Sequence, residues 1–89
     1  MSLFSNLSSD TRLEIVSNQK RLVLERMYIY LIRMGINPEL FDKDSYTPQD
    51  EGDLNEGEIY SQNELISSID EYNLLSAIEQ HLESATPNS

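Results

Sequence analysis

Residues 11–37 read TRLEIVSNQKRLVLERMYIYLIRMGIN, and this stretch decides the fold. No glycine or proline falls between residues 11 and 34, so nothing in the sequence interrupts a helix there. Apolar residues recur at the alternating three- and four-residue spacing of one helix face. Lys20 is the only polar member of that series, which consists of Leu13, Val16, Lys20, Val23, Met27, Tyr30 and Met34. The pattern predicts a helix over 11–34.

The second half of this helix is apolar on nearly every side. From Met27 to Met34 only Arg33 is polar. The segment MYIYLI also has strand propensity, but a strand of this uninterrupted length would be unusual. A helix that is apolar all round has to be covered on more than one side. We therefore expect this band to contact another protein through Met27, Tyr28, Tyr30, Leu31, Met34 and Phe41.

The end of the first helix has a clear local signal. Gly35 stands where a left-handed residue closes a Schellman motif, and Ile36 can then pack back on Leu31. Asn37 and Pro38 follow as an N-cap and a first helical residue. We expect a short helical turn over 38–42 that places Leu40 and Phe41 on the core.

A second helix is predicted over 61–84. Ser61-x-x-Glu64 has the form of a capping box, as does Thr11-x-x-Glu14 at the start of the first helix. Ser67 and Ser68 are poor helix formers, so a break there is an open alternative. The predicted apolar stripe comprises Leu65, Ile69, Tyr72, Leu75, Ile78 and Leu82.

The remaining segments are polar. Residues 43–60 are rich in acids and contain two glycines and a proline, which is typical of a long loop. Residues 1–10 are expected to form a flexible N-terminal segment, and residues 85–89 a disordered tail. The domain is thus an all-α, two-helix antiparallel hairpin with a short connecting helical turn and a long acidic loop.

Charge divides the chain into two parts. The sequence has 89 residues and a formal net charge of −10, from 6 Lys and Arg against 16 Asp and Glu. Residues 38–89 contain 13 of the acids and one cation, Lys43, so residues 1–37 have a small positive excess. Opposite charges favour packing of the first helix on the second.

Composition excludes several classes of function. The chain has no cysteine, which removes disulfide scaffolds, thiolate zinc sites and cysteine nucleophiles. An acidic balance is unsuited to direct contact with nucleic acid. No run reaches the ~18 apolar residues of a membrane span, and the start lacks the basic residues of a signal peptide. We expect a cytoplasmic protein.

The sequence offers little for catalysis. His81 is the only histidine, so a triad or a soft-metal site would lack partners. No glycine-rich phosphate loop is present. We expect no enzymatic activity, no catalytic residues and no cofactor.

One cation alternative stays open at this stage. Residues 53–64 place oxygen-bearing side chains at several positions of a twelve-residue calcium loop. However, the turn glycine expected at its sixth position is Glu58, and Pro48 and Gly52 interrupt the helix that should precede it. An acidic loop followed by a capped helix accounts for the same residues.

The second predicted helix resembles one known family over about 12 residues. Ser61-Gln62-Asn63-Glu64-Leu65, followed by Ile69 and by Glu71-Tyr72, is similar to the SQELD-x-x-I-x-E-Y segment of the small two-helix aspartyl-phosphate phosphatases of sporulation signalling. The resemblance implies a helical hairpin that docks a response regulator. Asn63 is an insertion relative to the family, and the family's functional aspartate falls on Ile66. The chain also has a longer loop than the family.

Taken together, these features favour a non-enzymatic interaction module. An adaptor, assembly chaperone or inhibitor would dock a partner through the apolar face of the first helix, with the acidic loop and second helix steering a basic surface. Two such helices form a small core, so we also expect a homo-oligomer or a subunit of a larger complex. Two alternatives remain: an acidic, nucleic-acid-mimicking inhibitor, and a small regulator of two-component signalling.

Overall fold

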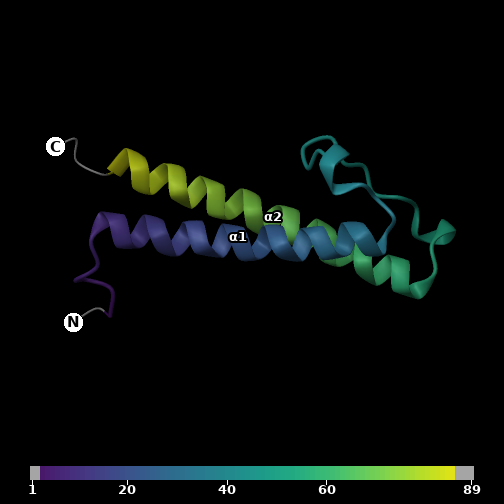
Figure 1. Ribbon diagram of the computed structural model, residues 1–89, viewed down its shortest axis with the longest axis horizontal. Helices are drawn as coiled ribbons and strands as arrows, with labels where there is room; N and C mark the ends of the chain where they lie inside the picture. The colour runs from purple at the N-terminus through teal and green to yellow at the C-terminus, as the bar shows by residue number, and fades with distance from the viewer. Residues whose placement is uncertain (1–2, 86–89) are drawn as a thin grey trace.

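The protein is an antiparallel two-helix hairpin. Its computed structural model describes residues 3–85, in which α1 (Ser9–Arg33) and α2 (Glu56–Ala85) lie side by side (Figure 1). Two single-turn 3₁₀ helices, η1 (Pro38–Leu40) and η2 (Glu51–Asp53), lie in the connection. Residues 3–85 contain no strand, so the predicted all-α fold is confirmed. The predicted disordered tail, 85–89, lies outside the described residues except for the last residue of α2.

The helix α1 begins earlier than the sequence predicted. Ser8 is its N-cap, and the Ser8 hydroxyl accepts a 3.1 Å hydrogen bond from the Thr11 amide. The predicted cap at Thr11 is therefore wrong. Thr11 occupies the third helical position instead, because Ser9 and Asp10 continue the helix backwards without a break. The segment before α1 includes a turn in which the Leu7 amide donates to the Phe4 carbonyl.

The end of α1 confirms the predicted Schellman motif. Gly35 has a φ of 72°, the left-handed value that glycine adopts without steric cost. The Ile36 amide donates to the Leu31 carbonyl at 2.9 Å, and the Gly35 amide donates to the Ile32 carbonyl at 3.1 Å. These bonds satisfy two of the carbonyls that would otherwise be unpaired at the helix end.

The turn that follows agrees with the prediction only in part. Asn37 caps η1 by accepting from the Glu39 amide at 3.0 Å, with Pro38 at the first position. Phe41 packs against the core as expected, but Leu40 is exposed. The prediction for Leu40 is wrong because a single 3₁₀ turn directs Pro38 and Phe41 inward and leaves Leu40 on the outside.

The helix α2 also begins earlier than predicted. The Asn55 side chain accepts from the Glu58 amide at 2.8 Å, and the Glu58 carboxylate accepts from the Asn55 amide at 3.1 Å. This reciprocal pair is the capping box, so the predicted box at Ser61 and Glu64 is wrong. Ser61 is buried inside the helix.

No break interrupts α2 at its two consecutive serines. The helix runs through Ser67 and Ser68 to Ala85. The Ser68 hydroxyl donates to the Glu64 carbonyl one turn earlier, at 2.8 Å. This local bond satisfies the buried hydroxyl without ending the helix.

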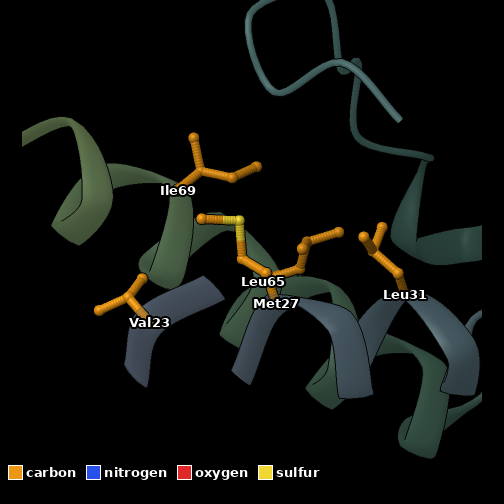
Figure 2. Close-up of a cluster of buried hydrophobic side chains, with 5 residues drawn as sticks. All are labelled: Val23, Met27, Leu31, Leu65 and Ile69. Carbon is orange, nitrogen blue, oxygen red and sulfur yellow. The ribbon is translucent and has the colours of Figure 1, made fainter. Parts of the chain in front are cut away.

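The core lies between the two helices, on the half of α1 that leads into the connection. In Figure 2, side chains from α1 and α2 converge there, with Met27 between the others. The buried cluster consists of Val23, Met27, Leu31, Leu65 and Ile69. Half-buried residues surround it, including Tyr30, Met34, Ile36, Phe41, Tyr46, Tyr72 and Leu75. The core is small, as expected for two helices.

Ion pairs join the helices as the charge division predicted. Lys20 Nζ lies 2.9 Å from Glu79 Oε1, and Arg26 Nη1 lies 3.0 Å from Glu71 Oε2. In both pairs the cation comes from α1 and the carboxylate from α2. Hydrogen bonding to Glu79 raises the pKa of the Lys20 ammonium, despite an opposing effect of burial.

Candidate docking surface

The structure separates the six predicted contact residues by depth. Met27 and Leu31 are buried in the core, whereas Tyr30, Met34 and Phe41 are half-buried around it. Tyr28 remains 54% exposed. The hairpin therefore covers most of the six predicted contact residues, and Tyr28 is the one that remains exposed to solvent.

A groove unites four of these six residues on one side of α1. It has a volume of about 380 Å³ and lies where α1 meets η1 and the middle of α2. Its lining is mostly apolar and consists of Leu24, Met27, Tyr28, Leu31, Pro38, Phe41, Lys43 and Tyr72. The Schellman ending of α1 turns the chain back, and this turn brings Pro38 and Phe41 beside the helix that precedes them.

An exposed apolar ridge adjoins the groove along α1. Leu24, Tyr28 and Ile32 follow one another at four-residue intervals, and each is about half exposed. Residues four apart are neighbours on a helix surface, so these side chains form a continuous row. We call this row, together with the groove, the groove face. A partner could insert one apolar side chain into the groove and lie along the ridge.

The segment that lines one end of the groove contains several charged residues. Lys43 is part of the lining, and the exposed acids Glu39, Asp42 and Asp44 neighbour the lining residues in sequence. Lys43 is held at the rim, because its ammonium donates to Asp44 Oδ1 at 2.9 Å and to Asn73 Oδ1 at 2.8 Å. The same ammonium lies 5.7 Å from the centre of the Tyr72 ring. Residues 38–44, which supply this end of the groove, therefore contain more acids than cations.

Gln62 anchors the long loop, a role that sequence reasoning missed. Its side chain is 2% exposed. The amide oxygen accepts from the Tyr46 hydroxyl at 2.9 Å and from the Gln49 backbone amide at 2.8 Å, and the amide nitrogen donates to the Gln49 carbonyl at 2.9 Å. The Tyr46 ring also packs on Phe41, with 5.6 Å between ring centres. These contacts fix residues 41–49 beside the groove.

Tyr30 lies on the opposite side of α1 from Tyr28 and is already partnered. Its ring meets Tyr60 of α2 edge to face, with 6.2 Å between centroids. The Arg33 guanidinium lies 5.4 Å from the centre of the Tyr30 ring. Tyr30 therefore contributes to packing between the helices in this structure, and Tyr28 is the more accessible tyrosine.

The fold does not form the calcium-binding loop that the sequence left open. Two of the would-be ligands, Ser61 and Glu64, lie inside α2 and therefore do not belong to a loop. A continuous helix cannot wrap their side chains around one ion together with those of Asp53 and Asn55, which precede it. Across residues 3–85, no group of three or more His, Cys, Asp or Glu side chains could hold a metal ion. His81 is exposed on α2.

The part of the chain that the structure describes holds no helix with the length and apolar character needed to cross a membrane.

Comparison with known proteins gives no match to a family model, to a curated protein or to a solved structure. The segment that resembles the sporulation phosphatases begins with Ser61 and Gln62, both buried in the hairpin. Ile66, at the position of the family's functional aspartate, is half-buried.

Proposed function

We propose that this protein is a non-enzymatic interaction module that docks a basic segment of another protein. The segment places an apolar side chain in the groove and lies along the ridge of Leu24, Tyr28 and Ile32. The observation that carries this proposal is the ridge itself, because three large apolar side chains stand half exposed beside an apolar groove. Contiguous exposed apolar surface of this kind is typical of protein contact sites.

The ridge is large enough to matter energetically. Burying a Leu, Ile or aromatic side chain fully contributes about 1.5–3 kcal/mol, so covering the exposed half contributes about 1 kcal/mol for each residue. Three residues then contribute about 3 kcal/mol, which corresponds to roughly a hundredfold in affinity. An anchor side chain in the groove would add to this.

Charge supports a basic partner. Residues 38–89 contain 13 acids and one cation, and the exposed Glu39, Asp42 and Asp44 lie in the segment that supplies Pro38, Phe41 and Lys43 to the groove. Negative charge around an apolar contact speeds the encounter with a positive segment and disfavours acidic competitors. Because these acids are exposed, salt should weaken the attraction.

A selection from a random-peptide phage library tests this proposal with the intact protein as bait. We expect enriched peptides to share one large apolar residue flanked by Lys or Arg. Tyr28→Glu should reduce their binding by about a hundredfold, because it places a charge in the middle of the ridge. Leu74→Glu, at an exposed apolar position on the outer side of α2, should leave binding unchanged.

Two results would contradict the proposal. One is the enrichment of acidic peptides, and the other is a set of peptides that bind Tyr28→Glu as tightly as the original protein. Circular dichroism of both variants provides the control for folding. The nucleic-acid mimic and the two-component regulator remain alternatives, and no contact in residues 3–85 favours either over docking at the groove face.

A further inference from the structure

The groove has walls from three parts of the chain. The helix α1 supplies most of the lining, α2 supplies Tyr72, and the connection supplies Pro38, Phe41 and Lys43. Pro38 belongs to η1, which follows closely on the Schellman ending of α1. Phe41 and Lys43 lie at and beyond the end of η1, so the helix ending alone does not fix their side chains. One wall of the groove therefore depends on what holds the loop that begins at Phe41.

Two residues of α2 hold this loop. Gln62, whose side chain is 2% exposed, bonds the Tyr46 hydroxyl and both backbone groups of Gln49, and the Tyr46 ring packs on Phe41. Asn73 accepts a 2.8 Å hydrogen bond from the Lys43 ammonium. We call these contacts of Gln62 and Asn73 with the loop the latch. Through the latch, α2 sets the positions of two groove residues that belong to the loop.

The latch can open without unfolding the hairpin. Within residues 42–53 only Lys43 and Tyr46 are half-buried, and all the other side chains are exposed. The buried cluster between the helices contains no residue of this loop. A segment with so few buried apolar contacts opens locally at a lower cost in free energy than the whole fold. When it opens, the groove loses one wall, whereas the ridge of Leu24, Tyr28 and Ile32 stays on α1.

Gln62 acts on the groove only through the loop. It is not among the residues that line the groove, and it precedes Tyr72 by about 15 Å along the axis of α2. A partner in the groove therefore has no direct contact with the Gln62 side chain. Any effect of Gln62 on binding has to pass through Tyr46 and Phe41.

We propose that partner binding in the groove and closing of the latch are coupled, with Gln62 as the positioning residue. This inference rests on the proposed docking function and concerns the regulation of the same site. A docked segment contacts Phe41 and Lys43 only while the latch is closed, but it contacts the ridge in both states. It therefore binds the closed state more tightly and shifts the population toward that state. By reciprocity, a change that opens the latch weakens binding by the same factor.

Amide hydrogen exchange of the intact protein tests the coupling. The Gln49 amide donates to Gln62 Oε1, so it exchanges when the latch opens. We expect a saturating amount of a peptide from the phage selection to slow this exchange about tenfold. The Gly52 amide provides the control, because it donates to Asp50 Oδ1 within η2 and should be unaffected. Unchanged exchange at Gln49 with saturating peptide overturns the coupling.

Peptide affinity provides the reciprocal measurement. Gln62→Leu should weaken binding of the same peptide by about the same tenfold factor, because the ridge remains and only the groove wall is lost. The matched variant Gln80→Leu, at an exposed position of α2, should bind as the original protein does. Tyr46→Phe keeps the ring on Phe41 and loses only the hydroxyl, so it should weaken binding by a smaller factor. It replaces Gln62→Leu in the test if that variant does not fold. Full affinity in the folded Gln62→Leu variant overturns the role of Gln62.

A measurement without peptide separates this inference from the docking function. Leu31 lines the groove and is 3% exposed. We expect a soluble nitroxide to relax the Leu31 methyl signals more strongly in Gln62→Leu than in the original protein, and not in Gln80→Leu. If Leu31 stays equally shielded in all three proteins, the latch does not form the groove wall, and this inference fails while the docking function stands. If the phage selection yields no peptide, the docking function fails and the coupling fails with it.

Discussion

The two helices contribute similarly to the core but differ on their outer sides. On the inner side, α1 supplies Val23, Met27 and Leu31, and α2 supplies Leu65 and Ile69. On the outer side, α1 exposes six large apolar residues among its cations: Ile15, Leu22, Leu24, Tyr28, Ile29 and Ile32. The helix α2 exposes fewer such residues and has many acids: Leu74 and Ile78 are exposed, and Tyr60 is exposed in part beside Tyr30 of α1.

This difference indicates which residues are needed for folding and which are available for contact with other proteins. The hairpin needs only the inner side of each helix, so folding does not explain the exposed apolar residues of α1. Acidic residues keep the outer side of α2 hydrated and repel other acidic surfaces. We infer that α1 makes contacts with other chains, while α2 supports the fold and supplies charge.

We expect the largest effect on the free energy of unfolding when leucines on the inner side of each helix are replaced, in comparison with leucines on the outer side. Leu65→Ala and Leu31→Ala should each lower the free energy of unfolding by about 2–5 kcal/mol, because they leave cavities in a small core. Leu74→Ala and Leu24→Ala should change it by less than about 0.5 kcal/mol. Urea unfolding followed by circular dichroism at one fixed protein concentration measures all four. An outer leucine that costs as much as an inner one would show that the outer side takes part in folding.

We expect an intermediate loss of stability when Gln62 is replaced. This residue gives α2 the role of anchoring the long loop, which α1 does not have. Gln62→Leu removes three hydrogen bonds and leaves the Gln49 amide and carbonyl without their partner, so we expect a loss of about 1–3 kcal/mol. Hydrogen exchange of the Gln49 amide should accelerate strongly. The matched variant Gln80→Leu, at an exposed position of α2, should change neither quantity. Unchanged exchange at Gln49 would show that other contacts hold the loop.

The helix ends allow a comparison of two glycines with opposite expected signs. Gly35→Ala should destabilise the hairpin by about 1 kcal/mol, because alanine is strained at a φ of 72°. Gly57→Ala should stabilise it by up to about 1 kcal/mol, since Gly57 lies in the first turn of α2 and an added Cβ would meet only Asn55 Oδ1 at an ordinary 3.5 Å. Thermal unfolding of both variants measures the difference. Equal signs would contradict the assigned helix ends.

The smallest expected effect is a loss of stability at alkaline pH. Hydrogen bonding to Glu79 raises the pKa of Lys20 above 10.5, and burial raises the pKa of Tyr46 above 10.0. Both groups hold their proton more tightly in the folded chain, so their contributions are complete at neutral pH and disappear as pH rises through these values. Tyr46→Phe and Lys20→Gln should each flatten the fall in the urea midpoint between about pH 9 and about pH 12. A fall of the same steepness in both variants would assign the alkaline loss to other groups.

Much of the fold could be predicted because it depends on local signals. The long uninterrupted run before Gly35 predicts α1, and the glycine with the following Ile36 predicts how that helix ends. The two N-termini were placed too late because several residues could serve as caps. Ser8 competes with Thr11, and Asn55 competes with Ser61. Sequence alone does not show which residue of each pair accepts the hydrogen bond that caps the helix.

From the sequence, the docking surface could be predicted only as an apolar segment of α1, without its division into buried and exposed residues. The excess of apolar residues near Met27 is visible in the sequence, but the division into buried Met27 and exposed Tyr28 depends on where α2 packs. Gln62 had no recognisable signal, because its partners Tyr46 and Gln49 belong to a loop that reads as irregular. A glutamine between apolar positions at the inner side of a predicted helix would be the signal to look for.

The central claim is that the outer side of α1, and not that of α2, contacts other chains. Relaxation of leucine methyl signals by a soluble nitroxide tests it directly in the intact protein, because Leu24 and Leu74 are both substantially exposed in the single chain. We predict that a selected peptide shields Leu24 from the nitroxide and leaves the relaxation of Leu74 unchanged. Equal relaxation of the two leucines in the presence of the peptide would contradict the account.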